Sequence, residues 1–411
     1  MKTTLAYKTK TRSLSIPNIL AFGIVVIALA ACGGGDGGNN TSTSASGETT
    51  TTTQDAVSQS SSALVTQTGA TAVPGTTSTA QAFDLTADIG DTWRLVLNQD
   101  GTFSIKVLST QYGLSGISGT YTQSTSGSFT TYTGTSPNGS FSLRLDTRTK
   151  TIIGQATLGT RSSSVAGTGY SVPTNTMTLA GDYFFLGATR NASDGSSSST
   201  VAGTFRLAAN GTDITLCDSG IINGLGKCDT PNGSSITPTQ AALKLVPNAT
   251  DGLMHVQIND GTAAAPVWND FGIMSFQAGD RGPVLTIDRF GNNQDTPPVM
   301  RTGAIYASKL QTLAQTVVNG FLACQDGGKP FANLQINGPQ VLLADSNGNY
   351  QPYAQLFYNN ISTGKGLYEV DGVATMVVGN QLVGSGALFL PLSSSLTVFE
   401  REATQTVAVC R

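Results

Sequence analysis

From about residue 83 onward, apolar and polar residues alternate in short runs that are separated by sequences typical of tight turns. The run Thr92–Leu97 alternates, a turn sequence follows at residues 98–101, and the run Phe103–Val107 alternates again. A period of two between apolar side chains predicts β-strands with one buried face. The pattern therefore predicts a hairpin here, and the same texture continues to the end of the chain.

Asp-Gly and Asn-Gly dipeptides recur throughout this region, and both tolerate the positive φ that tight hairpin turns require. Their spacing predicts that most strands pair with their neighbours in sequence, as in an antiparallel meander. We expect a mainly β fold of barrel or sandwich modules with at most one short helix. Asp-Gly begins at positions 100, 194, 251, 260, 326 and 371, and Asn-Gly at 138, 210, 223, 232, 319, 337 and 347.

One segment departs from the β pattern, because its apolar residues follow at helical spacing and Gly320 stands where a helix would end. The spacing predicts a short helix over Ala307–Asn319, with an edge strand as the alternative. The apolar residues are Leu310, Leu313, Ala314, Val317 and Val318.

Two short sequences recur along the chain. Gly90–Trp93 resembles Gly181–Phe184, and Gly119–Tyr121 resembles Gly203–Phe205. The similarity indicates two β-modules of related plan. Chance similarity is the alternative, because Gly and Thr are frequent throughout.

The N-terminus has a different pattern. Residues 1–31 contain four basic and no acidic residues, and an apolar run extends over Ile19–Ala31. This run is too short for a membrane-spanning helix of about 20 residues, and Pro17 and Asn18 directly before it interrupt any longer apolar stretch. A basic start, a short apolar run and small residues at its end are typical of a secretory signal peptide.

The sequence Leu29-Ala30-Ala31-Cys32 resembles the lipobox of bacterial lipoproteins. The resemblance implies that signal peptidase II cuts before Cys32, which becomes the first mature residue and carries diacylglycerol and an amide-linked acyl chain such as palmitate. More than one acyl chain gives stable anchoring. Since residue 33 is Gly rather than Asp, the resemblance implies the outer membrane, with the protein facing the periplasm or the cell surface.

Residues 32–82 consist mostly of Gly, Ser, Thr, Ala and Asn. Such a segment buries too little apolar area to offset the entropy of ordering its backbone, so we expect a flexible tether. The expected organisation is a signal peptide at 1–31, a tether at 32–82, an N-terminal β-module at 83–177 and a C-terminal β-region at 178–411.

The chain has 22 basic and 25 acidic residues, and removal of the four basic residues of the signal leaves 18 against 25, a net charge of −7. This balance argues against nucleic acid as a partner, since nucleic-acid binding needs clustered Lys and Arg. Charged residues make up only 11% of the chain, which is more typical of exported β-proteins than of helical cytoplasmic enzymes.

Four cysteines remain besides Cys32, and they allow three pairings in an oxidising compartment. We favour Cys217–Cys228, because Asn223-Gly224 lies midway between them and would form a hairpin turn. The remaining pair is then Cys324–Cys410. A zinc site is disfavoured because the spacings are not those of paired zinc ligands and His255, the only histidine, is not near a cysteine in sequence. We expect no metal and no cofactor.

Alternation around His255 places it on one face with Leu253 and Gln257, opposite an entirely apolar face. We therefore expect His255 on a polar surface rather than in a catalytic triad, which would need a neighbouring nucleophile and acid. The chain contains no Gly-x-Ser-x-Gly sequence that would supply such a nucleophile.

The densest charged group of the β region contains two Asp-Arg pairs separated by a predicted strand over Pro283–Ile287. Turns could gather these residues at one rim, where paired carboxylates would suit a glycosidase. The alternative is that the pairs simply close strand ends. If a polar site for saccharide or peptide exists, we expect it among Trp268, Asp270, Asp280, Arg281, Asp288 and Arg289.

Three functional hypotheses follow. The first is a lipid-anchored envelope lipoprotein that acts as a non-enzymatic binding or structural module for an unidentified protein or saccharide. The second is a carbohydrate-active enzyme that uses paired aspartates. The third is a barrel that captures a ligand, an analogy that rests on architecture alone.

Overall fold

A computed structural model describes residues 55–218, 220–222, 227–229, 235–236, 243–262, 264–292, 298–363, 366–379, 386–401 and 403–411. The signal peptide, Cys32, the tether as far as residue 54 and Asn223-Gly224 lie outside the described residues.

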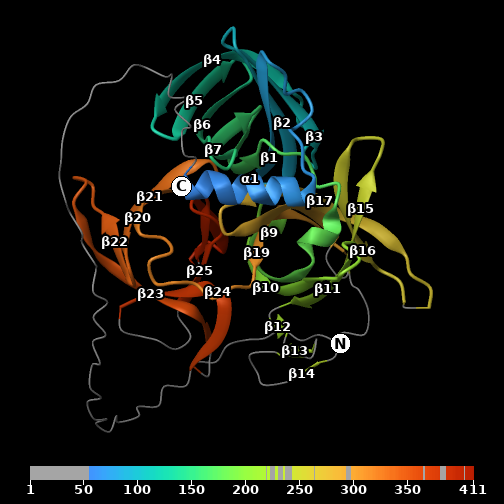
Figure 1. Cartoon of the computed structure of the whole chain (residues 1–411), viewed down its shortest axis with the longest axis vertical. Helices are drawn as coiled ribbons and strands as arrows, with labels where there is room; N and C mark the ends of the chain where they lie inside the picture. The colour runs from blue at the N-terminus through green and yellow to red at the C-terminus, as the bar shows by residue number, and fades with distance from the viewer. Residues whose placement is uncertain are drawn as a thin grey trace, which may run out of the picture. The chain divides into compact units, whose positions relative to one another are not determined.

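The described strands form three closed antiparallel barrels of eight strands each, which follow one another along the chain. In Figure 1 they run from blue to teal (barrel 1), from green to yellow (barrel 2) and from orange to red (barrel 3). The mainly β fold is confirmed, and the modules are barrels rather than sandwiches.

Barrel 1 contains β1 (Ala80–Ala87), β2 (Asp91–Asn98), β3 (Thr102–Ser109), β4 (Ile117–Ser126), β5 (Phe129–Ser136), β6 (Gly139–Asp146), β7 (Thr151–Leu158) and β8 (Arg161–Thr168). Barrel 2 contains β9 (Gly181–Asn191), β10 (Ser199–Leu207), β11 (Asp213–Asp218), β15 (Leu243–Asn248), β16 (Leu253–Asn259), β17 (Trp268–Gly279), β18 (Gly282–Asn292) and β19 (Met300–Lys309). Barrel 3 contains β20 (Gly320–Asp326), β21 (Lys329–Asn337), β22 (Gln340–Ala344), β23 (Tyr350–Thr363), β24 (Gly366–Val378), β25 (Gly386–Pro391), β26 (Thr397–Arg401) and β27 (Thr406–Cys410). A small sheet between β11 and β15 contains β12 (Ile221–Ile222), β13 (Cys228–Asp229) and β14 (Ser235–Ile236).

The hairpin predicted over residues 92–107 is formed by β2 and β3. Its register pairs Leu97 with Phe103 and Leu95 with Ile105. These side chains belong to the apolar cluster that fills barrel 1, and Gly101 takes a positive φ of 82° in the turn. Corresponding apolar clusters fill barrels 2 and 3.

Helix α1 (Ala56–Thr68) corrects the expectation of a flexible tether as far as residue 82. The Asp55 side chain accepts a hydrogen bond from the Ser58 amide at its start, and Gly69 ends it at a φ of 65°. These are the usual signals for the two ends of a helix. Leu64 and Val65 pack against the core of barrel 2, which stabilises a helix that a Ser- and Thr-rich sequence would hardly form alone.

The predicted domain boundaries need one further change. Barrel 1 spans residues 80–168, close to the expected N-terminal module, whereas the expected C-terminal region contains two barrels at 181–309 and 320–410. A short 3-10 helix, η1 (Thr176–Leu179), precedes barrel 2.

The helix predicted over Ala307–Asn319 is wrong. Strand β19 continues to Lys309, and residues 310–319 are irregular. Leu313 and Val318 belong to the core of barrel 3, while the Asn359 side chain bonds both the amide and the carbonyl of Leu313. Residues 310–319, here called the plug, thus place Leu313, Val317 and Val318 against the core of barrel 3 without forming a helix.

Both predicted disulfides are present, Cys217–Cys228 and Cys324–Cys410. The first joins β11 to the small sheet. The second joins β20 to β27, where Cys324 and Cys410 are direct cross-strand partners, and so it lies on the seam that closes barrel 3.

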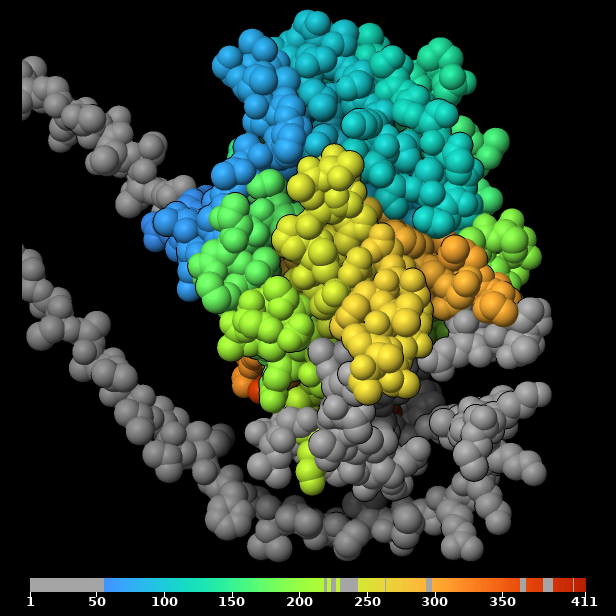
Figure 2. Space-filling model, turned by 90° about the vertical axis from the view of Figure 1, so that its right-hand side faces the viewer, coloured from blue at the N-terminus to red at the C-terminus, as the bar shows by residue number. Residues whose placement is uncertain are grey.

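A fourth apolar cluster, here called the shared core, lies outside the three barrels and contains side chains from all of them. All three barrels belong to one compact unit of the chain. Figure 2 shows barrel 1 (blue to cyan) directly against barrel 2 (green to yellow) on one face. The buried members are Ile153, Ala166, Phe184, Leu186, Val284, Ala304, Tyr306, Val370, Val373, Leu390, Leu392, Leu396, Val398, Val407 and Val409.

The shared core predicts that the barrels unfold together. Replacing Leu390→Ala in barrel 3 should destabilise the fold by about 2–5 kcal/mol, as other buried Leu-to-Ala changes do. The two tryptophans lie in barrels 1 and 2. Tryptophan fluorescence during urea denaturation therefore measures whether a substitution in barrel 3 destabilises the other two barrels. The exposed Leu367→Ala is the matched control. An unshifted tryptophan transition in Leu390→Ala would show that barrel 3 unfolds independently.

Candidate functional site

The structure does not gather the six predicted site residues at one rim. Asp280 and Arg281 form the turn between β17 and β18, and Asp280 Oδ1 accepts a hydrogen bond from the Ser394 amide of barrel 3. Asp288 lies further along β18, where its Oδ2 accepts a 2.8 Å bond from Thr92 Oγ1 of barrel 1. The two Asp-Arg pairs therefore bind separate neighbours.

Asp270 lies beside His255 on the outer face of barrel 2, whereas Trp268 pairs with Asn259 at the other end of β16. Asp270 Oδ2 is 3.1 Å from His255 Nδ1, and Asp251 Oδ2 is 2.8 Å from His255 Nε2. Burial alone would lower the pKa of His255, but hydrogen bonds and charges from the two carboxylates outweigh it and raise the pKa. His255 is thus on the polar face, as predicted, with both ring nitrogens engaged. Lys244 Nζ lies 4.2 Å from the Trp268 ring centroid.

The two arginines of the predicted site hold main-chain oxygens. Arg281 Nη1 donates to Val317 O at 3.0 Å, which fixes the plug of barrel 3 against barrel 2. Arg289 Nη1 donates to Gly291 O and Arg301 O. Burial lowers the pKa of Arg289 to about 10, with a smaller effect from the neighbouring Arg301 charge. Both side chains serve the fold.

Asp91 and Asp288, here called the acid pair, are the closest match to the paired aspartates of the enzyme hypothesis. Both are 0% exposed and lie where barrel 1 meets barrel 2. Burial, followed by the charge of Asp91, raises the pKa of Asp288 to about 8, and burial raises that of Asp91 to about 6. Asp288 Oδ1 has no hydrogen-bond partner, so no donor stabilises a negative charge on this oxygen. A glycosidase pair must flank its substrate, whereas the acid pair is enclosed.

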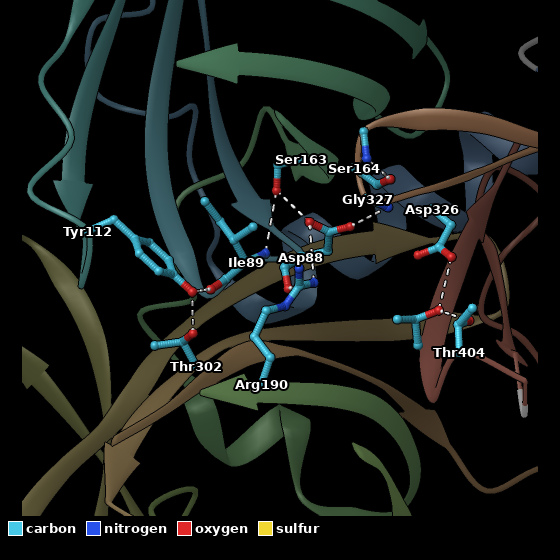
Figure 3. Close-up of polar contacts among 12 residues, drawn as sticks. Asp88, Ile89, Tyr112, Ser163, Ser164, Arg190, Thr302, Asp326, Gly327 and Thr404 are labelled. Carbon is cyan, nitrogen blue, oxygen red and sulfur yellow. Dashed lines mark hydrogen bonds and ion pairs between the residues drawn. The ribbon is translucent and has the colours of Figure 1, made fainter. Parts of the chain in front are cut away.

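Further polar groups from all three barrels meet around Asp88, as Figure 3 shows. Its carboxylate accepts bonds from Ser163 Oγ at 2.6 Å and from the Gly327 amide at 3.0 Å. Arg190 Nη2 bonds the main-chain oxygen of Asp88 at 3.1 Å, and Asp326 accepts from Arg401 and Thr406. The gap between these groups is about 10 Å³, room for about one water. This arrangement is a joint between barrels rather than a substrate site.

The candidate binding site is a cavity of about 380 Å³ between barrels 1 and 3, here called the inter-barrel pocket. Small-molecule sites usually measure about 300–1,000 Å³. One wall comes from the outer face of β5, β6 and β7. The other comes from the plug, the turn between β25 and β26 and the seam of barrel 3. The lining residues are Phe129, Arg144, Asp146, Thr151, Val317, Val318, Asn319, Gly320, Phe321, Leu322, Ser393, Ser394, Ser395, Leu396, Thr397, Cys410 and Arg411.

Asp146 holds the floor of this pocket together. It accepts two side-chain bonds from Arg148, at 2.9 and 2.7 Å, and a 2.7 Å bond from Ser395 Oγ of barrel 3. Burial would raise the pKa of Asp146, but these bonds outweigh it and lower the pKa. The carboxylate is therefore fully committed to Arg148 and Ser395.

The inter-barrel pocket is not predictable from the sequence pattern. Arg144 alternates with apolar residues in β6, which indicates only that it points outward from barrel 1. The residues of barrel 3 that line the pocket with it come more than 170 positions later in the chain, and nothing in the local pattern indicates which barrel packs there.

Comparison with protein-family models found no match to this chain, and no curated protein matches it. Within the described part of the chain, no helix is both long and apolar enough to span a membrane.

The acid pair predicts a definite pH dependence of stability. The pKa of Asp288 is higher in the folded than in the unfolded protein. Its contribution to the free energy of unfolding is therefore fully present below about pH 4 and is lost as the pH rises to about 8. Replacing Asp288→Asn should remove this decline and raise the free energy of unfolding at pH 8 by up to several kcal/mol.

Urea denaturation at several pH values between 4 and 8 measures this effect. Asp371→Asn, a change at an exposed aspartate, serves as the control and should follow the wild type. An unaltered pH profile in Asp288→Asn would mean that Asp288 is charged in the folded protein.

Proposed function

We propose that this chain is a lipid-anchored lipoprotein of the bacterial cell envelope whose three-barrel body binds a small ligand without converting it chemically. The sequence around Cys32 supports the anchor, and the inter-barrel pocket supports the binding. The first described helix begins at Ala56, more than 20 residues after Cys32 in the sequence.

The position of the pocket is the observation that carries the binding role. Apolar side chains fill the interior of each barrel, which weighs against capture of a ligand inside a barrel. The acid pair is enclosed between barrels 1 and 2, which weighs against glycan hydrolysis there. The inter-barrel pocket is instead a cavity of ligand size with both polar and apolar walls.

Replacing Cys32→Ser tests the anchor. The protein expressed in an enteric host should lose incorporation of labelled palmitate and move from the membrane to the soluble fraction, because no acyl chain remains to hold it. Gly33→Asp is the matched control and should keep the label. Unchanged labelling or unchanged membrane association of Cys32→Ser would refute the anchor.

Blocking the pocket tests the binding role. Ser394 lines the pocket, is exposed and bonds the fold through its main-chain amide, so Ser394→Trp should fill the cavity and preserve the structure. Wild-type protein without its lipid should enhance the fluorescence of anilinonaphthalene sulfonate or of uncharged phenylnaphthylamine, and Ser394→Trp should not. Ser118→Trp, at an exposed position on β4, should behave as the wild type. The binding role fails if neither dye binds or if Ser394→Trp binds them normally.

A further inference from the structure

The inter-barrel pocket contains two guanidinium groups, one from each barrel. Arg144 is the cross-strand partner of Ile153 in barrel 1, and Arg411 Nη1 donates a 3.1 Å hydrogen bond to Ile153 O. The backbone register therefore brings the side chain of Arg411 alongside that of Arg144. Burial lowers the pKa of Arg411, and the positive charge of Arg144 lowers it further.

Neither of these two arginines forms an ion pair with a carboxylate among the described residues, although the nearby charge of Asp146 opposes the effect of burial on the pKa of Arg144. Arg144 lies over the Phe129 ring, 3.9 Å from its centroid, and Arg411 bonds only a neutral carbonyl. Asp146 is the one acidic residue of the lining, and its oxygens are occupied by Arg148 and Ser395. Two like charges held together in a partly buried site are unfavourable when no carboxylate bonds either of them directly, and a bound anion would reduce that cost.

A third group in the pocket lacks a partner. Thr151 is 1% exposed, and its Oγ1 forms no hydrogen bond. Buried hydroxyl groups are normally hydrogen-bonded, so this atom is available to donate to a ligand oxygen. Thr151 lies on the same wall as Arg144, since it pairs across strands with Asp146, two residues beyond Arg144 on β6.

The opposite part of the pocket is apolar. Val317, Val318 and Leu322 come from the plug and β20, and Phe321 remains 66% exposed beside them. Exposed aromatic groups next to a cavity are a usual feature of binding sites for organic ligands. The wall would accept a hydrocarbon or aromatic portion of a ligand.

We infer, on the basis of the proposed binding function, that the inter-barrel pocket selects an organic anion with an apolar body. A carboxylate, sulfonate or phosphate group lies between Arg144 and Arg411 and accepts a hydrogen bond from Thr151. The apolar body lies against the plug and Phe321. Guanidinium groups suit such anions because they present several donors in a planar arrangement.

Two dyes that differ in one charged group test this inference. The protein without its lipid should bind anilinonaphthalene sulfonate more tightly than phenylnaphthylamine, and inorganic phosphate should displace the sulfonate dye. Arg144→Gln and Arg411→Gln should each lower the affinity for the sulfonate dye about tenfold or more, as expected for loss of a hydrogen bond to a charged group. Their affinity for phenylnaphthylamine should change less than about twofold.

Arg161→Gln is the matched control, because Arg161 also lies over an aromatic ring, that of Tyr112, but does not line the pocket. Thr151→Val keeps the shape of the side chain and should lower the affinity for the sulfonate dye alone. This variant tests the site even if loss of Arg144 disturbs the packing on Phe129.

Equal binding of the two dyes by the wild type, or normal sulfonate affinity in both Arg144→Gln and Thr151→Val, would overturn the anion selectivity. Either result would leave the proposed binding function standing, provided that Ser394→Trp still abolishes dye binding. Failure of both dyes to bind would overturn the two proposals together.

Discussion

Burial of the outer faces of the barrels is the constraint on which this structure depends. A barrel whose interior is filled must still present an outer surface, and here parts of three such surfaces form the shared core. Strands next to it are therefore buried on both faces: in β18 six consecutive residues, Pro283–Asp288, are buried. Two-sided burial replaces alternation with continuous apolar runs, as in Tyr183–Leu186 and Ala304–Ala307. The same packing encloses the acid pair and the polar groups around Asp88, and both Asp288 and Asp88 accept hydrogen bonds from another barrel.

The seam of barrel 3 links this packing to the candidate site. Strands β20 and β27 pair at only two positions, whereas β19 and β9 close barrel 2 with nine. The Cys324–Cys410 disulfide joins one of those two pairs, so a covalent bond reinforces the shortest closure. Cys410 and Arg411 also line the inter-barrel pocket. The disulfide therefore fixes one wall of the pocket as well as the closure of the barrel.

The local sequence pattern predicts the strands well, because alternation indicates which face of a strand is buried and the turn dipeptides indicate where strands end. The repeat was aligned wrongly, however. In the structure Thr92–Leu95 on β2 corresponds to Thr204–Leu207 on β10, since Asp84–Arg94 and Asp182–Arg206 form equivalent ion pairs between the first two strands of each barrel. The predictions of a helix over residues 307–319 and of a six-residue polar site failed for a different reason. The plug and the two Asp-Arg pairs take their conformation from contacts with neighbouring barrels, and residue spacing along one strand carries no information about those contacts.

The inter-barrel pocket was unpredictable on the same grounds, and its origin bears on how binding and stability are related. Arg144 belongs to barrel 1 and Arg411 follows the last strand of barrel 3, so the two charges approach only when those barrels pack together. Their mutual repulsion opposes that packing, while Asp146, through Ser395, and the shared core favour it. An anion that bridged the two arginines would therefore bind only the packed form and would stabilise it by mass action.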